Sequence, residues 1–388
     1  MRPRQERLHH LDALRALTMV LILPAHALAL IGLQSGWNSL EAATFWTIHV
    51  FRLPLFFLIA GFFAALLLET RGPGGLVRNR TIRIGVPLLL GVALVVPVLN
   101  VCLFEASAQP NRSAGGALDT LTQVQPSYLW FLWYLVLLYA IALPAQRLVG
   151  RRPAAASLHR TGSKLLGHPL APLLLAVPTG LLLYRQPAWI AGSSHTQTFA
   201  PAPDLLAYYG LFFFSGWALF AVPGLRSSIE SRPGIYSLLA GLALPPALAF
   251  YLLHSQPAIG ASRAFHLLAL LLLSISTWSI AFALLGLSRR HLSDENPRLR
   301  AWADSSYWIY LSHFVPMAAL AALLVGIAMP GTLRAALLVA ITFALVYPAY
   351  WAFVRYTFLG RVLHGPRIRP RADRLPPTRQ PVVAAPPA

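Results

Sequence analysis

Long apolar segments recur along the whole chain and constrain its fold more than any other feature. Each is about twenty residues long, which is the length a helix needs to cross the hydrocarbon core of a bilayer. The segment at 165–184 has the weakest pattern because Pro169, Pro172 and Pro178 interrupt it. We therefore predict an all-α polytopic membrane protein whose transmembrane helix bundle has about ten spans, at 12–33, 46–69, 83–104, 128–147, 165–184, 204–223, 235–254, 264–287, 305–328 and 333–359.

The composition excludes the other broad classes of protein. Hydrophobic residues make up 57% of the 388 residues and charged residues only 11%, whereas a soluble domain has about a quarter charged residues. A disordered or collagen-like chain is excluded on the same grounds. The first apolar segment is too long for a cleavable signal peptide and carries Asp12 and Arg15, so we expect it to be a retained helix.

The net charge of +19 would suggest a nucleic-acid partner in a soluble protein. In a membrane protein the position of the basic residues shows whether the charge reflects topology or a nucleic-acid partner. Of the 31 Lys and Arg residues, 24 fall in loops on one side of the predicted spans and four on the other. Basic loops stay in the cytoplasm, so both termini are predicted to be cytoplasmic, with the lipid bilayer and no nucleic acid as partner. The remaining three, Arg15, Arg52 and Arg355, lie within spans.

The chain divides into one large domain and a short tail. Residues 1–360 are predicted to form a single integral-membrane domain, and residues 361–388, rich in Pro and Arg, a disordered cytoplasmic tail. The single cysteine, Cys102, permits no intramolecular disulfide, and nothing around it has the spacing of metal ligands. We expect neither a metal site nor a bound cofactor.

Ionisable residues within a span are costly and are therefore candidates for function. Arg15 lies near the cytoplasmic start of the first span, and His26 follows eleven residues later, about 16 Å further along a helix and on nearly the same face. His26 is thereby placed beyond the middle of the membrane. The alternative is structural: Arg15 extends to the interface and His26 bonds a neighbouring helix.

A polar stripe formed by Ser306, Tyr310 and His313 marks the ninth span. His313 lies about 12 Å from the cytoplasmic side, at a depth comparable to that of His26. Such a stripe can simply hold helices together. A histidine can also act as a general base near neutral pH, and no other residue type in these spans can.

Two further groups of basic residues lie at the start of the second span and in the loop that follows it. His49 and Arg52 lie three residues apart in the outer leaflet, where Arg52 could bind a carboxylate, stabilise an oxyanion or anchor to lipid phosphate. The loop that follows holds a cluster of arginines that suits phosphate but that the positive-inside rule explains unaided. These are Arg71, Arg78, Arg80 and Arg83.

Taken together, these residues resemble a known family. The segment 7–16 followed by His26 is similar to the opening of membrane-bound acyltransferase family 3, whose marker is Arg or Lys, ten residues, then His. Arg80-Thr81-Ile82-Arg83 resembles that family's Arg-x-x-Arg pattern, and the segment 306–313 resembles its late Ser-Tyr-x-x-Tyr-Leu-x-His pattern. The resemblance covers about residues 7–360.

Within that family the chain is most similar to the glucans biosynthesis protein C group, which is associated with succinylation of osmoregulated periplasmic glucans. The similarity rests on His49-x-x-Arg52 followed by Phe56-Phe57, and on the segment 129–132. One residue departs from the group: Tyr128 stands where a histidine commonly precedes Leu-Trp-Phe.

The resemblance implies an O-acyltransferase of a bacterial inner membrane that moves a succinyl or acetyl group from cytoplasmic acyl-CoA, a co-substrate, to hydroxyls of an extracytoplasmic glycan. His26 is then the expected general base, Arg15 holds the donor or orients the site, and His313 is a second candidate base or an acyl carrier. The CoA phosphates are assigned to Arg80 and Arg83, reinforced by Arg71 and Arg78, and substrate contacts to Arg52, His49, Ser306 and Tyr310.

Two other functions fit the same residues. Buried Arg and His also suit a proton-coupled transporter or a polysaccharide exporter, although no pair of broken helices suggests inverted repeats. A structural membrane scaffold is the third possibility. The sequence leaves the acyl group, the glycan and the oligomeric state open.

Overall fold

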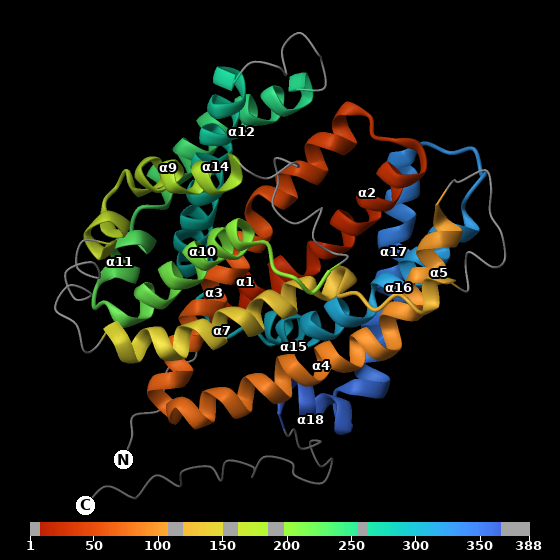
Figure 1. The fold of residues 1–388 in the computed structure, drawn as a ribbon, viewed down its shortest axis with the longest axis horizontal. Coiled ribbons are helices and arrows are strands. Elements are labelled where there is room, and N and C mark those ends of the chain that lie inside the picture. Colours follow the sequence, from red (N-terminus) through yellow and green to blue (C-terminus); the bar gives the residue numbers. More distant parts are fainter. Residues whose placement is uncertain (1–7, 108–118, 150–161, 185–197, 255–262, 366–388) are drawn as a thin grey trace, which may run out of the picture.

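The protein is an assembly of helices, described by a computed structural model for all residues except 1–7, 108–118, 150–161, 185–197, 255–262 and 366–388 (Figure 1). The described residues contain no strand. The α-helices are α1 (His9–Val20), α2 (Ile22–Ser35), α3 (Ser39–Arg80), α4 (Val86–Leu90), α5 (Val96–Ala106), α7 (Trp130–Val149), α9 (Ala171–Tyr184), α10 (Pro203–Ala221), α11 (Leu225–Glu230), α12 (Pro233–His254), α14 (Arg263–His291), α15 (Pro297–Ser312), α16 (Phe314–Leu323), α17 (Gly331–Ala349) and α18 (Phe358–His364). Shorter π- and 3₁₀-helical turns are η1 (Thr81–Gly85), η2 (Gly91–Val95), η3 (Ser127–Leu129) and η4 (Tyr350–Val354).

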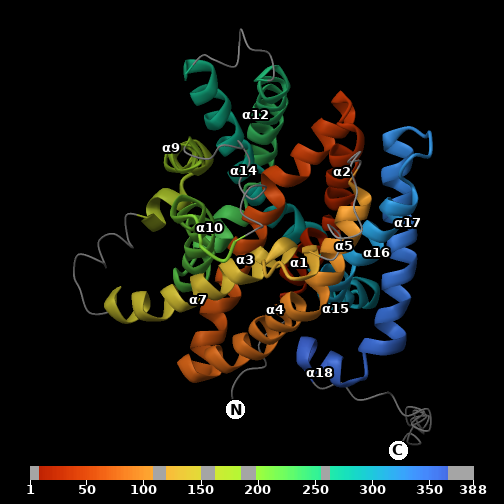
Figure 2. The same ribbon diagram turned by 45° about the vertical axis from the view of Figure 1, so that its right-hand side comes forward.

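The helices form two flanks around a central group. One flank holds α9 to α14 and the other α2, α5, α16 and α17, while α1, α3 and α15 lie between them (Figures 1 and 2). Contacts between α12 and α14 and between α2 and α17 hold each flank together. The central helices carry most of the candidate site residues.

Two predicted spans are interrupted by proline. A proline lacks the backbone N–H and its ring clashes with the carbonyl four residues earlier. Pro24 acts on Val20 in this way, and the span predicted as one helix over 12–33 consists of α1 and α2, joined at Leu21. Pro316 acts on Ser312, and α15 and α16 are bent by 55° at the break between them. Both breaks lie close to the predicted functional histidines.

Glycines bring α3 and α10 into close contact. A Cβ at Gly61 would overlap the carbonyl oxygen of Phe213, and a Cβ at Gly216 would overlap that of Leu58. Small residues allow helix backbones to approach closely in a membrane, where dispersion contacts rather than the hydrophobic effect drive association. The pair of glycines therefore fixes how closely α10 packs against the helix that carries Arg52.

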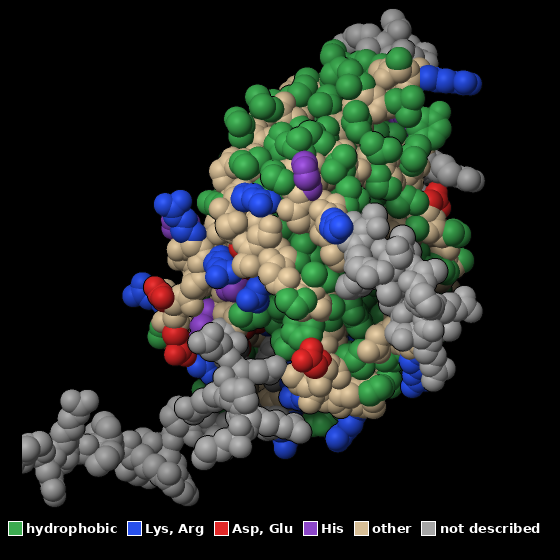
Figure 3. Space-filling view, turned by 90° about the vertical axis from the view of Figure 1, so that its left-hand side faces the viewer, with side chains coloured by type: hydrophobic (Ala, Val, Ile, Leu, Met, Phe, Trp, Pro, Cys, Tyr) green, Lys and Arg blue, Asp and Glu red, His purple; other side chains and the backbone are tan. Residues whose placement is uncertain are grey.

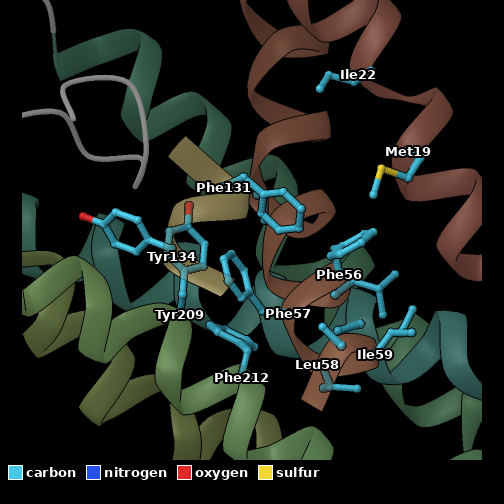
Figure 4. Packing of buried hydrophobic residues seen from close by; sticks show 14 of the residues in the cluster. Met19, Ile22, Phe56, Phe57, Leu58, Ile59, Phe131, Tyr134, Tyr209 and Phe212 are labelled. Atoms are coloured by element: carbon cyan, nitrogen blue, oxygen red, sulfur yellow. The ribbon is translucent and has the colours of Figure 1, made fainter. Parts of the chain in front are cut away.

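Aromatic side chains fill the space among α3, α7 and α10 (Figure 4). The rings of Phe57 and Tyr209 are stacked with their centroids 4.4 Å apart. Phe131 packs edge-on against both Phe56 and Phe57, at 4.6 and 5.0 Å. Such large rings bury extensive surface with few rotatable bonds and make this part of the core rigid.

The outer surface is that of a membrane protein. Large apolar side chains are exposed on several helices, among them Leu89 (70%), Leu238 (63%) and Phe353 (69%), and a soluble monomer does not expose apolar surface on this scale. In Figure 3 apolar side chains cover the upper part of one face, and charged ones gather in its lower part. The chain is thus a multi-pass membrane protein.

Fewer described helices than the ten predicted spans pass a strict test of length and hydropathy. Seven of the described helical segments are long and apolar enough to cross a bilayer, or eight if the bent α15–α16 pair is one span. One of them, Ser39–Ala106, is 68 residues long and covers two predicted spans; Gly72, in a left-handed conformation, and Pro73 divide it. Ala171–Tyr184, where the pattern was weakest, is a shorter apolar helix. Ten spans and the orientation of the termini stay predictions.

A buried carboxylate joins three helices near one end of the bundle. Glu230 at the end of α11 contacts His10 of α1 at 3.2 Å and Arg289 of α14 at 2.5 Å, with Arg226 one turn earlier at 3.7 Å. Burial by itself raises the pKa of Glu230, but these hydrogen bonds and positive charges outweigh it, so the pKa lies below its ordinary value.

The ordered structure continues slightly past the predicted domain boundary at residue 360. Helix α18 runs across that boundary to His364 and packs against η1 and α15. The predicted disordered tail, apart from its first residues, lies outside the described part of the chain.

Candidate functional site

The two intramembrane histidines singled out by the sequence lie in direct contact. His313 Nε2 is 2.9 Å from His26 Nδ1, a hydrogen-bond distance, although the residues are 287 positions apart. Their ring centroids are 5.0 Å apart. His26 comes from α2, and His313 occupies the break between α15 and α16.

The two histidines differ in accessibility. His313 has 0% of its surface exposed, whereas His26 is partly exposed. Within the pair, only His26 therefore retains accessible surface. Both positions were predicted, and the structure separates them into an outer and an inner member of one pair.

The helix break holds the inner histidine in place. His313 Nδ1 lies 3.0 Å from the Ile309 carbonyl oxygen and 2.9 Å from that of Tyr310. Next to it, the hydroxyl of Tyr128 donates to the Leu311 carbonyl at 2.5 Å. Side chains thus supply hydrogen bonds to backbone carbonyls around the break, as burial in a membrane requires.

Aromatic rings enclose the pair. Phe314 lies 4.3 Å from the His26 ring centroid, and Tyr128 meets both histidine rings edge-on at 6.3 and 5.8 Å. Tyr310 donates its hydroxyl to the Tyr128 carbonyl at 3.1 Å, so this predicted substrate contact is engaged in holding the tyrosine. Sequence reasoning missed the parts played by Tyr128 and Phe314. The available signals were the position of Tyr128 before the Leu-Trp-Phe segment and that of Phe314 beside His313.

A buried arginine adjoins the pair. Arg52 is only 4% exposed, and its charge acts on both histidines and on Tyr209 and Tyr310. Its Nε has no hydrogen-bond partner, and no carboxylate pairs with it among the residues that the structure describes. A buried cation without a counter-ion is costly, and an anionic ligand or transition state would relieve that cost.

His49 is close to Arg52 but is engaged elsewhere. Its Nδ1 donates to the Phe45 carbonyl at 2.8 Å, and its ring lies 3.9 Å from the Phe45 ring centroid. The charge of Arg52 acts on His49 as well. The structure therefore places His49 near the site without bringing it into the histidine pair.

Three of the remaining basic residues meet at a separate cavity of about 290 Å³. Arg15, Arg80 and Arg83 line it, and Arg15 also pairs with Asp12 at 3.1 Å. The Arg80 guanidinium lies over the Tyr139 ring at 4.8 Å, and its Nε has no partner among the described residues. Arg15, expected on the same helix face as His26, thus lies beside the two arginines assigned to the CoA phosphates.

The other two arginines of the loop do not line the cavity. Arg71 and Arg78 are exposed, and neither borders it. Arg71 is still near enough to repel Arg83 electrostatically. Their outward position could not be predicted from their spacing in the loop.

Helix α15 connects the cavity with the histidine pair. Ser306 and Tyr307 border the cavity, and His313 follows seven residues after Ser306, about 10 Å along the axis. Ser306 donates its hydroxyl to the Ala303 carbonyl and is buried. The arrangement thus joins a cavity lined by arginines, a buried cation and a partly exposed imidazole. Among the described residues no three His, Cys, Asp or Glu side chains form a group that could hold a metal.

Comparison with known proteins gives one family and one set of named relatives. A family model described as an acyltransferase domain matches residues 8–351. Relatives named "Glucans biosynthesis protein C" from Escherichia coli O157:H7 and from Salmonella typhimurium strain LT2 are each 26% identical to this chain, over 325 and 327 residues. Both alignments cover 79% of this chain and 81% of the relative. No solved structure matches. The resemblance drawn from the sequence motifs is confirmed.

Proposed function

Because the chain belongs to the acyltransferase family whose model covers residues 8–351, and is an acyl-transferring enzyme, we propose that it moves an acyl group from acyl-CoA to a hydroxyl of an extracytoplasmic glycan, with His26 as the general base. The relatives' name points to a glucan as the acceptor. A bacterial inner membrane is the corresponding location, with acyl-CoA entering from the cytoplasm.

One observation supports the proposal: His26 is the partly exposed member of a histidine pair formed between two helical segments that are apolar enough to cross a membrane. Acyl transfer between substrates on opposite sides of a bilayer needs a base within it. In this reaction His26 takes the proton of the sugar hydroxyl as the oxygen attacks the thioester carbonyl. The carbon–sulfur bond then breaks, and the CoA thiolate leaves and takes up the proton.

The basic cavity is the proposed donor site. Guanidinium groups bind phosphate oxygens through paired hydrogen bonds, and Arg80 has an unpartnered Nε available there. A volume of about 290 Å³ suits part of CoA rather than the whole molecule. We therefore assign the phosphates nearest the thioester arm to Arg15, Arg80 and Arg83, with the exposed Arg71 and Arg78 drawing the anionic donor toward the entrance.

Arg52 is proposed to hold the negative charge that arises or arrives beside the histidines. One candidate is the oxyanion formed at the thioester carbonyl; the other is the free carboxylate of a succinyl group. The two are distinguished by comparing succinyl-CoA with butyryl-CoA, a neutral donor of equal chain length. A carboxylate site predicts that Arg52→Gln impairs only succinyl transfer, and an oxyanion site that it impairs both.

The experiment that tests the function measures CoA release by the purified protein in lipid vesicles supplied with acyl-CoA and glucan. We expect release that depends on the glucan and is abolished by His26→Ala. His266→Ala, which removes a histidine of α14 far from the pair in sequence, serves as the control and should release CoA normally. A transporter or a scaffold, the alternatives that the sequence allowed, releases none even as the wild type.

A further inference from the structure

The two histidines of the pair differ in their hydrogen bonds and in their exposure. We infer that His313 is a positioning residue that fixes the tautomer of His26, so that Nε2 of His26 is the atom that accepts the substrate proton. This inference rests on the proposed function for its chemistry, although the tautomer itself is a property of the resting protein. It assigns to His313 neither of the two parts that the sequence suggested, second base or acyl carrier.

The first step concerns Nδ1 of His313, the ring nitrogen that does not face His26. Its Nδ1 faces two carbonyl oxygens, of Ile309 and Tyr310, at 3.0 and 2.9 Å. Carbonyl oxygens only accept hydrogen bonds, so the proton of His313 must lie on Nδ1. A neutral imidazole carries one ring proton, which leaves its Nε2 with a free lone pair.

The pair is neutral because of its surroundings. Arg52 already places a positive charge beside both rings, with no carboxylate paired to it in the described part of the chain. A second uncompensated cation at this depth would add a large cost. The nearest enclosing side chains, Phe314 and Tyr128, carry no charge that could offset it.

The second step passes from His313 to His26. The unprotonated Nε2 of His313 lies 2.9 Å from Nδ1 of His26, and it can only accept. His26 must therefore carry its proton on Nδ1 and donate it to His313. Its Nε2 is left with a lone pair on the edge of the ring away from His313.

The third step is accessibility. His26 is partly exposed and His313 is not exposed at all. Both nitrogens of His313 are engaged in hydrogen bonds, so it has no free atom with which to attack a thioester or receive a substrate proton. When His26 accepts a proton at Nε2, the oxyanion formed at the thioester carbonyl in the same step compensates the new positive charge. The Nδ1–H of His26 continues to donate to His313, and this hydrogen bond stabilises the imidazolium without further proton transfer.

Two substitutions of His313 test this role. Glutamine offers a side-chain oxygen that can accept from His26 Nδ1–H but can neither titrate nor carry an acyl group, whereas leucine offers no acceptor. We expect His313→Gln to keep kcat within about tenfold of the wild type and His313→Leu to lose about 10²–10⁴-fold, with the KM for acyl-CoA unchanged in both. Equal inactivation of the two variants would overturn the inference, and so would full activity of His313→Leu.

A spectroscopic measurement does not depend on activity or on these variants folding. In protein labelled with ¹⁵N-histidine and reconstituted in lipid, the His26 resonances are identified by their loss in His26→Gln. We expect a protonated Nδ1 and an unprotonated Nε2. The opposite tautomer would refute the assignment. If this tautomer is found but the wild type transfers no acyl group, the proposed function fails and the hydrogen-bond order stands.

Discussion

His313 Nε2 lies 2.9 Å from His26 Nδ1, at the meeting point of two helices that proline has broken. Pro24 and Pro316 each remove a backbone hydrogen bond four residues upstream of themselves. His26 of α2 and His313 at the α15–α16 junction lie close to these breaks. The stability of this arrangement depends on the groups that satisfy the freed backbone, and the following predictions start there.

Removing the Tyr128 hydroxyl should loosen the break beside His313. Tyr128→Phe deletes the hydrogen bond to the Leu311 carbonyl and leaves that buried acceptor unpaired, at a cost of about 1–3 kcal/mol. We expect a lower thermal midpoint and a reduced kcat with little change in the KM for acyl-CoA. Tyr184→Phe, on the more exposed surface of α9, is the control. An unchanged kcat in Tyr128→Phe would show that the break does not depend on this bond.

The contact between α3 and α10 should not tolerate a methyl group. Gly61→Ala places a Cβ against the Phe213 carbonyl and forces the helices apart, which costs about 1–3 kcal/mol or more. Gly241→Ala is a matched control, because that helical glycine has open space around its Cβ position. Thermal unfolding in detergent distinguishes them. Equal midpoints for both variants would mean that the close approach is absent.

The Glu230 cluster should make stability dependent on acid. The folded-state pKa of Glu230 lies below its ordinary value of 4.5, so the unfolded chain binds the proton more readily. The stabilisation is thus present above about pH 4.5 and is lost as the pH falls through the lower folded value. We expect Glu230→Gln to lower the thermal midpoint at pH 7 and to reduce its fall between pH 5 and pH 3.

The exposed pair of Glu295 and Arg300 provides the control for that prediction. Glu295→Gln should leave both the midpoint at pH 7 and its acid dependence close to those of the wild type, since exposed ion pairs contribute little. If Glu230→Gln and Glu295→Gln behave alike, the buried cluster does not cause the acid sensitivity.

Substitutions in the basic cavity should act on donor binding. Each charged hydrogen bond to phosphate contributes about 1.5–3 kcal/mol, so Arg80→Ala and Arg83→Ala should each raise the KM for acyl-CoA by about 10- to 100-fold while kcat changes less. Arg78→Ala, outside the cavity, should have a clearly smaller effect. Initial rates at varied acyl-CoA measure this. An equal rise in all three would indicate a diffuse electrostatic effect instead of a site.

Depth along the membrane was predictable from the sequence, but contact between helices was not. A rise of 1.5 Å per residue placed His26 and His313 at similar depths, and their contact at 2.9 Å agrees with that placement. The chain is helical and apolar as predicted, although fewer than ten of the described segments are long enough to span a membrane. Which helices become neighbours depends on packing, such as the glycine contacts of α3 and α10, that leaves little trace in periodicity. For that reason the pairing of the histidines and the outward position of Arg71 and Arg78 emerged only from the structure.

Residues with a structural role at the site were the hardest to predict from the sequence. Tyr128 looked like a departure from the pattern of a related group, yet its hydroxyl and its carbonyl both hold the helix break. Pro24 and Pro316 do not by themselves indicate a break in the sequence, because proline is tolerated in membrane helices. Their effect is local and geometric, and it bears on the proposed function because His26 follows one break and His313 occupies the other.

Mass spectrometry of the glucan acceptor tests the central claim most directly. Vesicles containing the wild-type protein, supplied with succinyl-CoA or acetyl-CoA and glucan, should yield glucan heavier by the mass of one or more acyl groups. His26→Gln, present in equal amount and equally stable, should yield unmodified glucan. Acylated glucan at wild-type levels from His26→Gln would contradict the assignment of His26 as the base.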